Sequence, residues 1–217
     1  MVVLALSGGL DSATLLATLL AERHTPVFPV FFRYGSKHNG WEEAAAVKIA
    51  AHYQLELHCV DLVSVFASVQ SALLAHDSRP IPEEEYQADS MAQTLVPGRN
   101  LIFASVLASL AESRGFSTVA LATHAGDHHL YPDCRPSFNA SLDQTIQEST
   151  NGAVRLYTPF NAMHKADIVA KGAKLGVPFA LTRSCYAERE KGCGVCGTCR
   201  ERRSAFTANG LIDPEAE

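Results

Sequence analysis

The stretch LSGGLDS, residues 6–12, stands between an apolar run and a segment with helical periodicity. Two adjacent glycines let the backbone turn sharply and approach a ligand closely. The helix predicted to begin near Leu10 presents unpaired N–H groups and a positive dipole end to that turn. Ser7 and Ser12 add hydroxyl donors, and Asp11 can orient a metal ion or the loop itself. The stretch therefore predicts a phosphate-binding turn.

A simpler interpretation of the same stretch is an ordinary tight turn in which Asp11 serves as the N-terminal cap of the helix. Its position directly after the first apolar run favours the phosphate-binding interpretation, because such turns bind anions where a strand leads into a helix. No lysine follows at the spacing of a GxxxxGK[ST] loop, so the P-loop class is excluded.

Outward from this turn, short β-branched runs alternate with helical patterns over most of the chain. This rhythm is typical of a parallel sheet with helices on both faces. The predicted strands are residues 2–7, 27–34, 55–62, 118–124 and 154–160. The predicted helices are residues 10–23, 41–53, 100–115, 137–150 and 164–175. We therefore expect an α/β fold, a doubly wound parallel five-stranded sheet.

Two segments break this rhythm. Residues 76–98 carry three prolines and the acidic run EEEY without periodicity, which is typical of a lid or binding loop, with a disordered surface insertion as the alternative. In residues 183–203, Gly and Cys replace aliphatic residues, so a hydrophobic core cannot order that part of the chain.

Four cysteines in the second segment are spaced as metal ligands, with seven, two and two residues between them. Neighbouring glycines allow the tight turns that point sulfur atoms inward. Four thiolates leave no open position, so we expect a structural zinc ion that supplies folding free energy to a small tail. An iron–sulfur cluster and redox-active CxxC pairs are the alternatives. The expected ligands are Cys185, Cys193, Cys196 and Cys199.

Composition bounds the function. The 217 residues are 47% hydrophobic, enough to bury one domain core with a small appendage. Eighteen basic against twenty-three acidic residues give a net charge of −5, which argues against binding bulk nucleic acid. No run of roughly 18 apolar residues predicts a membrane span, and the first residues lack a signal-peptide pattern. We therefore expect a cytoplasmic protein with no membrane partner.

The turn SGGLDS resembles the PP-loop of ATP pyrophosphatases, which transfer AMP from ATP to a carbonyl or carboxylate oxygen. Further stretches resemble, in order, the motifs of the 7-cyano-7-deazaguanine synthase family. They are FRYGSKH (32–38), VPGRN (96–100), YPDCR (131–135), SCYAERE (184–190) and CGVCGTCRERR (193–203). The resemblance covers residues 3 to about 206, nearly the whole chain.

This resemblance implies an adenine nucleotide alpha hydrolase-like fold that uses ATP, magnesium and zinc. Residues 1–180 would form the ATP-binding and catalytic domain, and residues 181–217 a zinc-binding tail packed on it. The implied activity is a ligase that converts 7-carboxy-7-deazaguanine and ammonia to 7-cyano-7-deazaguanine, for synthesis of queuosine-type modified guanines. A homodimer is also implied.

One departure from the family pattern keeps an alternative open. The family has Ser-Gly before YPDCR, whereas this chain has His129 and Leu130. The alternative is a related enzyme that adenylates carboxydeazaguanine and joins it as an amide to a protein or other amine acceptor. Sulfur transfer to tRNA through a persulfide on Cys134, and a non-enzymatic zinc-knuckle nucleic-acid binder, are further alternatives, although no base can be assigned to the thiol.

The resemblance and the residues together give a predicted site. Arg99 lies where the predicted lid loop meets the helix 100–115, so its guanidinium can clamp an anion. Lys165 opposes the dipole at a helix start, which suggests that a ligand holds it. The predicted catalytic residues are Asp11, Arg99 and Lys165. The predicted ATP-binding residues are Leu6, Ser7, Gly8, Gly9, Leu10, Asp11, Ser12, Ala13, Thr14, Leu15, Leu16, Arg99 and Asn100. A surface-capping Arg99 and a solvated Lys165 are the alternatives.

The segment GDHHLYPDCR follows the fourth predicted strand, at the sheet edge where ligands bind in open α/β folds. Its polar side chains are suited to a heterocycle, a substrate carboxylate or Mg²⁺. The predicted substrate-binding residues are Asp127, Tyr131, Asp133 and Arg135. For His128 and His129, a functional role and a solvated loop position remain open. The basic run CRERR (199–203) is interpreted as a solvated helix start rather than an RNA-binding surface.

Overall fold

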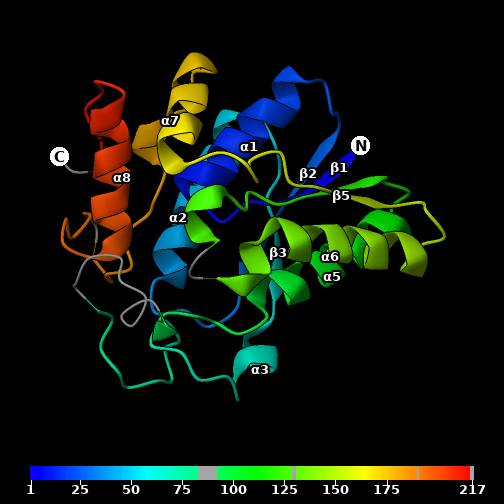
Figure 1. Ribbon diagram of the computed structural model, residues 1–217, viewed down its shortest axis with the longest axis horizontal. Helices are drawn as coiled ribbons and strands as arrows, with labels where there is room; N and C mark the ends of the chain where they lie inside the picture. The colour runs from blue at the N-terminus through cyan, green and yellow to red at the C-terminus, as the bar shows by residue number, and fades with distance from the viewer. Residues whose placement is uncertain (83–91, 129–130, 190, 216–217) are drawn as a thin grey trace.

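The computed structural model describes residues 1–82, 92–128, 131–189 and 191–215. Five strands form one parallel sheet in the order β3-β2-β1-β4-β5 (Figure 1). The strands are β1 (Val2–Ala5), β2 (Val27–Arg33), β3 (His58–Asp61), β4 (Thr118–Ala120) and β5 (Arg155–Tyr157). The chain winds outward from β1 in one direction and then in the other, so the predicted doubly wound sheet is confirmed.

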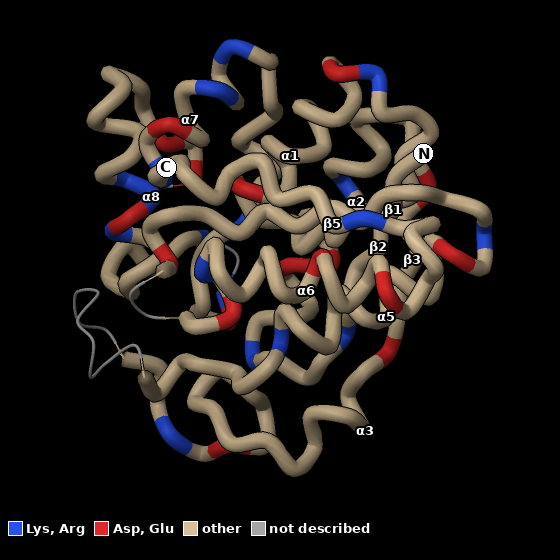
Figure 2. Tube along the Cα trace, turned by 45° about the vertical axis from the view of Figure 1, so that its right-hand side comes forward, with Lys and Arg blue, Asp and Glu red and all other residues tan. Residues whose placement is uncertain are grey.

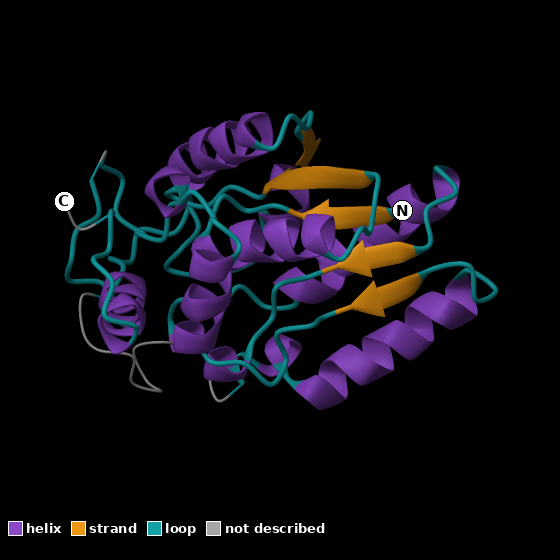
Figure 3. Cartoon of the chain, turned by 90° about the horizontal axis from the view of Figure 1, so that it is seen from above, coloured by secondary structure: helices purple, strands orange, loops and turns teal. Residues whose placement is uncertain are grey.

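Helices cover both faces of the sheet (Figures 1 and 3). One face carries α1 (Leu10–Ala21), α2 (Asn39–His52), α7 (Lys165–Lys174) and α8 (Gly197–Ala208). The other face carries α5 (Arg99–Ser113) and α6 (Pro136–Ser149). Short elements complete the described chain: α3 (Val63–Phe66) and the 3-10 turns η1 (Ala125–Asp127), η2 (Pro132–Cys134) and η3 (Phe179–Leu181).

The central strand explains why both faces need cover. Val2, Leu4 and Leu6 point into the core under α1 and α7, while Val3 points into the core under α5. All four side chains are fully buried. A strand buried on both faces reads as a continuous apolar run, which is why residues 2–6 lack polar alternation.

The structure differs from the sequence prediction in several places. β1, β4 and β5 are shorter than the predicted strands 2–7, 118–124 and 154–160, and α8 was not among the predicted helices. The third strand pairs only over His58–Asp61, because Leu55 and Leu57 pack against the core before the ladder begins. The prediction of a solvated CRERR was wrong for Arg202, which is 2% exposed on α8. Arg200 and Arg203 are exposed as expected.

Some predictions concern residues that lie outside the described part of the chain. Residues 83–91 of the predicted lid loop, including its acidic run, lie outside the described residues, as do His129 and Leu130. Basic and acidic residues are interspersed along the trace (Figure 2). Among the described helices, none has the length and apolar character needed to cross a bilayer.

Candidate active site and metal centre

A cavity of about 240 Å³ lies at the carboxyl ends of β1, β2 and β4. This is the edge where the winding direction reverses, and open α/β sheets bind their ligands there. The turn 6–12 forms part of its wall, together with side chains from α2, α5, α7 and the tail after residue 181. The predicted phosphate-binding turn and the cysteine-rich tail therefore meet at one site.

The backbone at Gly8 admits no side chain. Its φ is +83°, and a Cβ atom there would lie 2.4 Å from the carbonyl oxygen of Glu42 and 2.9 Å from the amide nitrogen of Ala46. The Gly8 carbonyl in turn accepts a hydrogen bond from the Arg183 amide at 2.9 Å. The turn is thus held between the start of α2 and the tail, which fixes it as a preformed cradle.

The first turn of α1 supplies the expected donors. The first intrahelical bond runs from the Ala13 amide to the Gly9 carbonyl at 3.0 Å, so the preceding amides of the helix have no intrahelical acceptor. The Ser12 hydroxyl donates to the Gly9 carbonyl at 3.1 Å and lies 3.1 Å from the Ser7 hydroxyl. These bonds shape a turn that fits a diphosphate.

A cluster of charged side chains lies beside this helix start; we call it the lysine cluster (Asp11, His124, Asp127, Lys165 and Glu201). The Lys165 Nζ lies 2.7 Å from Asp11 Oδ2 and 3.5 Å from Glu201 Oε2. Burial alone would lower the pKa of Lys165, but the neighbouring carboxylates of Asp11 and Glu201 outweigh it and raise that pKa. Burial likewise opposes ionisation of Asp11, yet Lys165 and His124 hold its pKa below the ordinary value.

One oxygen of this cluster has no hydrogen-bond partner in the described chain. Asp11 Oδ1 is buried and unpaired, while its other carboxylate oxygen meets Lys165. A hard cation with oxygen ligands, such as Mg²⁺ carried by a nucleotide, fits such an atom.

His124 was not singled out from the sequence, although it ends the predicted fourth strand at the ligand-binding edge. Its Nδ1 accepts a hydrogen bond from the Gly126 amide at 3.2 Å, which assigns the proton of the neutral ring to Nε2. That nitrogen lies 3.4 Å from Asp127 Oδ2 and 3.9 Å from Asp11 Oδ2. Burial lowers the pKa of His124 to about 4 and raises the pKa of Asp127 to about 7. Asp127 can therefore exchange a proton near neutral pH.

Arg99 places an unpaired cation at the cavity wall. It is the first residue of α5, its Nη1 lies 3.5 Å from the Tyr34 hydroxyl, and its guanidinium carbon lies 5.8 Å from the centre of that ring. Among the described residues no carboxylate forms an ion pair with it, so the predicted capping of a surface carboxylate does not occur there. Its guanidinium is available to an anion.

The four predicted substrate-binding residues are not brought together. Asp127 and Tyr131 line the cavity, whereas Asp133 and Arg135 lie outside its wall. Asp133 accepts a hydrogen bond from the Asn100 amide at 3.0 Å, and Arg135 donates to the His128 carbonyl at 2.9 Å. These two contacts shape the loop, and the substrate roles of all four residues remain predictions.

Cys134 also lines the cavity, close to α5. The Asn100 side-chain amide lies 3.2 Å from its sulfur. Burial raises the pKa of Cys134 well above its usual range, so the group is a thiol at neutral pH. Since the thiolate is the nucleophilic form, the structure offers no activation of this cysteine.

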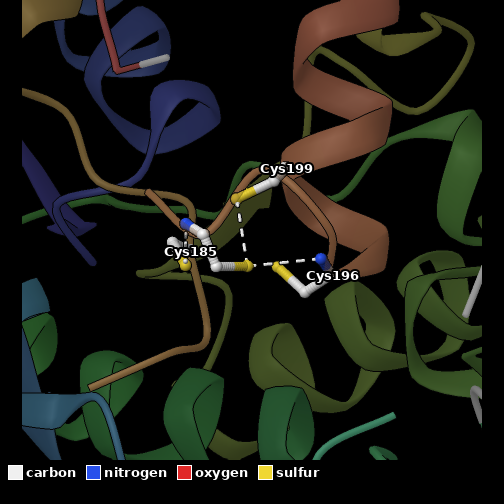
Figure 4. Close-up of side chains that lie close together, drawn as sticks. Cys185, Cys196 and Cys199 are labelled. Carbon is white, nitrogen blue, oxygen red and sulfur yellow. Dashed lines mark hydrogen bonds between the residues drawn. The ribbon is translucent and has the colours of Figure 1, made fainter. Parts of the chain in front are cut away.

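The four predicted metal ligands converge. The sulfur atoms of Cys185, Cys193, Cys196 and Cys199 all lie within 4.8 Å of one another, and the Cys193 and Cys199 sulfurs are 3.9 Å apart. Figure 4 shows Cys185, Cys196 and Cys199 side by side. Zinc–sulfur bonds of about 2.3 Å in a tetrahedron place sulfurs about 3.8 Å apart. A four-iron cluster holds its thiolates farther apart, because each binds a different iron atom. The set therefore fits one tetrahedral ion.

Backbone amides surround these sulfurs in the manner of a metal centre's outer shell. The amides of Ala187 and Cys193 donate to the Cys185 sulfur at 3.3 and 3.1 Å, and the Cys196 amide donates to the Cys193 sulfur at 3.3 Å. Such bonds orient thiolates and stabilise their charge.

Arg202 joins parts of the metal-binding tail to one another and to the body of the protein, where its Nη2 donates to the Phe179 carbonyl at 3.2 Å. Its guanidinium donates to Asp213 Oδ1 and to the Thr182 hydroxyl, both at 2.8 Å. Glu215 accepts hydrogen bonds from the Ser184 amide at 3.0 Å and the Cys185 amide at 3.2 Å. These contacts hold the tail so that it completes the cavity wall with Ser184, Tyr186, Thr198 and Glu201.

The family described as "Queuosine biosynthesis protein QueC" matches residues 1–210. This chain belongs to that family. The 7-cyano-7-deazaguanine synthase of Methanoregula boonei is 41% identical over 98% of this chain and 96% of its own length. The enzyme of the same name from Desulfotalea psychrophila is 40% identical over 94% of this chain and 92% of its own length.

A more distant likeness concerns the fold alone. The U34-tRNA thiolase NcsA from Methanococcus maripaludis, solved with its 4Fe-4S cluster, superposes with a TM-score of 0.53 at 17% identity. The match covers 96% of this chain and 64% of the thiolase. It agrees with the doubly wound sheet.

Proposed function

We propose that this chain is an ATP-dependent ligase that makes 7-cyano-7-deazaguanine from 7-carboxy-7-deazaguanine and ammonia. The observation that carries the proposal is membership of the QueC family, with relatives of that activity's name about 40% identical over nearly the full length of both chains. A preformed phosphate-binding turn that faces a cavity supports it.

The chemistry explains why the site needs ATP. A carboxylate resists attack because its leaving group would be an oxide, so an acyl oxygen first displaces diphosphate from the α-phosphorus of ATP. Ammonia then attacks the acyl carbon, AMP leaves and an amide forms. A second adenylation, on the amide oxygen, allows AMP and the amide protons to leave and the carbon–nitrogen triple bond to form. Each nitrile therefore requires two ATP molecules.

We assign roles to the residues on this basis. The turn 6–12 would bind the diphosphate, and Asp11 would hold, through Oδ1, a magnesium ion that neutralises its charge. Lys165 and Arg99 stabilise the negative charge that develops on the transferred phosphorus and on diphosphate. Asp127 and Tyr131 face the acyl substrate. The four cysteines hold a structural zinc ion, which orders the tail.

The test is a stoichiometric one. Purified zinc-loaded protein is supplied with ATP, magnesium, carboxydeazaguanine and ¹⁵N-ammonium, and the products are identified by mass spectrometry. We expect a nitrile that contains one ¹⁵N atom, and two AMP molecules for each nitrile. A reaction that stops at one AMP and an amide joined to a protein amine would replace this proposal with the amine-acceptor alternative. The predicted homodimer is tested separately by analytical ultracentrifugation.

A further inference from the structure

A second group of polar side chains lines the cavity at the start of α2, apart from the lysine cluster. His38 precedes the helix and Glu42 lies in its first turn, and both side chains face the cavity. The His38 side chain is 2% exposed and that of Glu42 is 20% exposed. Neither residue has a role in the reaction as described so far.

Both side chains are left with unused hydrogen-bonding capacity. His38 Nδ1 is buried without a partner in the described chain. Its Nε2 lies 3.6 Å from Glu42 Oε1, and no Arg or Lys of the described residues forms an ion pair with that carboxylate. Buried polar groups in folded proteins are almost always hydrogen-bonded. The group is therefore completed by something that the described residues do not provide.

The position of this group relative to the phosphate-binding turn is fixed by the backbone. The Glu42 carbonyl oxygen packs directly on Gly8, where a Cβ atom would come within 2.4 Å. The Glu42 amide donates to the His38 carbonyl at 3.1 Å, which ties the two residues together. A ligand held by Glu42 therefore lies at a set distance from the diphosphate.

Aromatic side chains make the surrounding wall suitable for a flat ring. Tyr34, Phe103, Tyr131 and Tyr186 all line the same cavity. The Tyr186 ring centre lies 5.1 Å from that of His38. Planar heterocycles bind between such side chains, with a few polar groups to fix their orientation.

We infer that Glu42, held by His38, is the specificity-determining residue that binds the 2-amino-4-oxo pyrimidine edge of the deazaguanine substrate. This inference rests on the proposed function. The edge presents two parallel N–H donors, the ring lactam N–H and the exocyclic amine, and a carboxylate accepts both with its two oxygens. The corresponding edge of adenine presents a ring-nitrogen acceptor beside its amine, which a carboxylate repels. Glu42 thereby allows the site to discriminate between the deazaguanine substrate and the adenine base of ATP.

Protons should accompany this binding. Burial raises the pKa of Glu42 to about 8, so the free protein carries it protonated near neutral pH. Two N–H donors favour the ionised form, and binding therefore expels the proton. The charged or titratable groups that face Glu42 are His38, Tyr34 at the end of β2, Arg99 on α5, and Arg183 and Tyr186 from the tail. Burial lowers the pKa of His38 to about 3 and raises that of Tyr34, whereas burial raises the pKa of Asp127, across the cavity, to about 7.

The experiment is calorimetric titration of the zinc-loaded protein with carboxydeazaguanine and with its 2-desamino analogue, in the presence of a non-hydrolysable ATP analogue. We expect E42Q to bind carboxydeazaguanine about 10- to 100-fold more weakly, as for a lost charged hydrogen-bond pair. The wild type should discriminate between the two ligands by about 10-fold, and E42Q by less than about twofold. Buffers of different ionisation enthalpy should report close to one more released proton for the wild type than for E42Q, because any proton released by Asp127 is common to both.

Controls separate the possible outcomes. E43Q is the matched variant, because Glu43 is the next residue of α2 but pairs with Arg33 outside the cavity. It should bind both ligands as the wild type does. The inference is overturned if E42Q weakens binding of the ATP analogue as much as that of carboxydeazaguanine, or if E42Q keeps full affinity for carboxydeazaguanine. It is also overturned if the wild type binds carboxydeazaguanine and its 2-desamino analogue equally, a result that needs no variant. Failure of the wild type to bind carboxydeazaguanine at all would instead refute the proposed function.

Discussion

The Nζ atom of Lys165 lies 2.7 Å from Oδ2 of Asp11, which joins the first turn of α7 to the first turn of α1. A lysine at a helix start opposes the helix dipole. Here two carboxylates, Asp11 and Glu201, compensate for that position and keep the ammonium charged in a largely buried place. The pair holds a cation beside the phosphate-binding turn and leaves one carboxylate oxygen free for a metal ion.

Replacement of Asp11 should therefore abolish the chemistry. We expect D11N to lower the rate of AMP release by at least about 100-fold, the usual effect of removing one group that stabilises transition-state charge. The measurement is AMP release with carboxydeazaguanine and ammonium. E22Q, at the far end of α1, is the control and should be unaffected. Near-normal turnover in D11N would remove the PP-loop assignment.

Alanine at Gly8 should be more damaging than alanine at Gly35. Both glycines have φ near +80°, so both substitutions cost about 1–2 kcal/mol in backbone energy. A Cβ atom at Gly35 would meet nothing closer than 3.7 Å, whereas at Gly8 it would overlap the Glu42 carbonyl. We expect G8A to lose about 1–3 kcal/mol more in urea unfolding and to bind ATP more weakly. Equal stabilities would mean that α2 does not press on the turn.

The stability of H124Q relative to the wild type should depend on pH. In the unfolded chain His binds a proton below about pH 6.5, whereas in the folded protein burial lowers the pKa of His124 to about 4. The unfolded state binds more protons between these values, so this residue makes wild-type stability fall as pH decreases from 6.5 to 4.

Glutamine at position 124 cannot titrate and keeps a side-chain N–H donor. The free energy of unfolding of H124Q minus that of the wild type should rise by up to about 3 kcal/mol as pH falls through this window. Urea unfolding at pH 4.5, 5.5 and 6.5 measures the difference, from which groups common to both proteins cancel. A difference independent of pH would show that His124 is not buried as a neutral ring.

Removal of the metal should unfold the tail before the sheet. We expect one zinc ion per chain by elemental analysis, and a chelator should lower the melting temperature and expose Tyr186 to solvent, because thiolate binding supplies the order of this segment. Readdition of zinc should restore both properties. Iron and the visible absorption of an iron–sulfur cluster, in place of zinc, would contradict the assignment.

Arg202 should matter far more for stability than its neighbour. R202M leaves the buried carboxylate of Asp213 without its cation and Glu215 with Arg183 alone, and breaking such a buried pair typically costs about 3–5 kcal/mol. R203M, at an exposed position, is the matched control and should change stability by less than about 0.5 kcal/mol. Comparable unfolding free energies for the two variants would show that the tail is held by other contacts.

Local patterns carried most of what could be predicted. The turn 6–12 and the four cysteines between residues 185 and 199 each lie within a short stretch of the sequence, and the local spacing of their residues indicates their chemistry. The apolar pattern of the sequence was enough to predict the parallel sheet, because both faces of β1 are buried. His124 and Glu42 could not be recognised in the same way, since their environment comes from α7, α5 and the tail, far away along the chain. The burial of Arg202 depends on Asp213 and Thr182, which no local pattern relates to it.

The tail closes one side of the cavity with Ser184, Tyr186, Thr198 and Glu201, all of them positioned by the cysteine cluster or by α8. On the proposed role of the metal, a chain without it would lack this wall and also the Arg183 amide that donates to the Gly8 carbonyl. If the tail orders only with its metal, as proposed, metal binding would have to precede completion of the cavity.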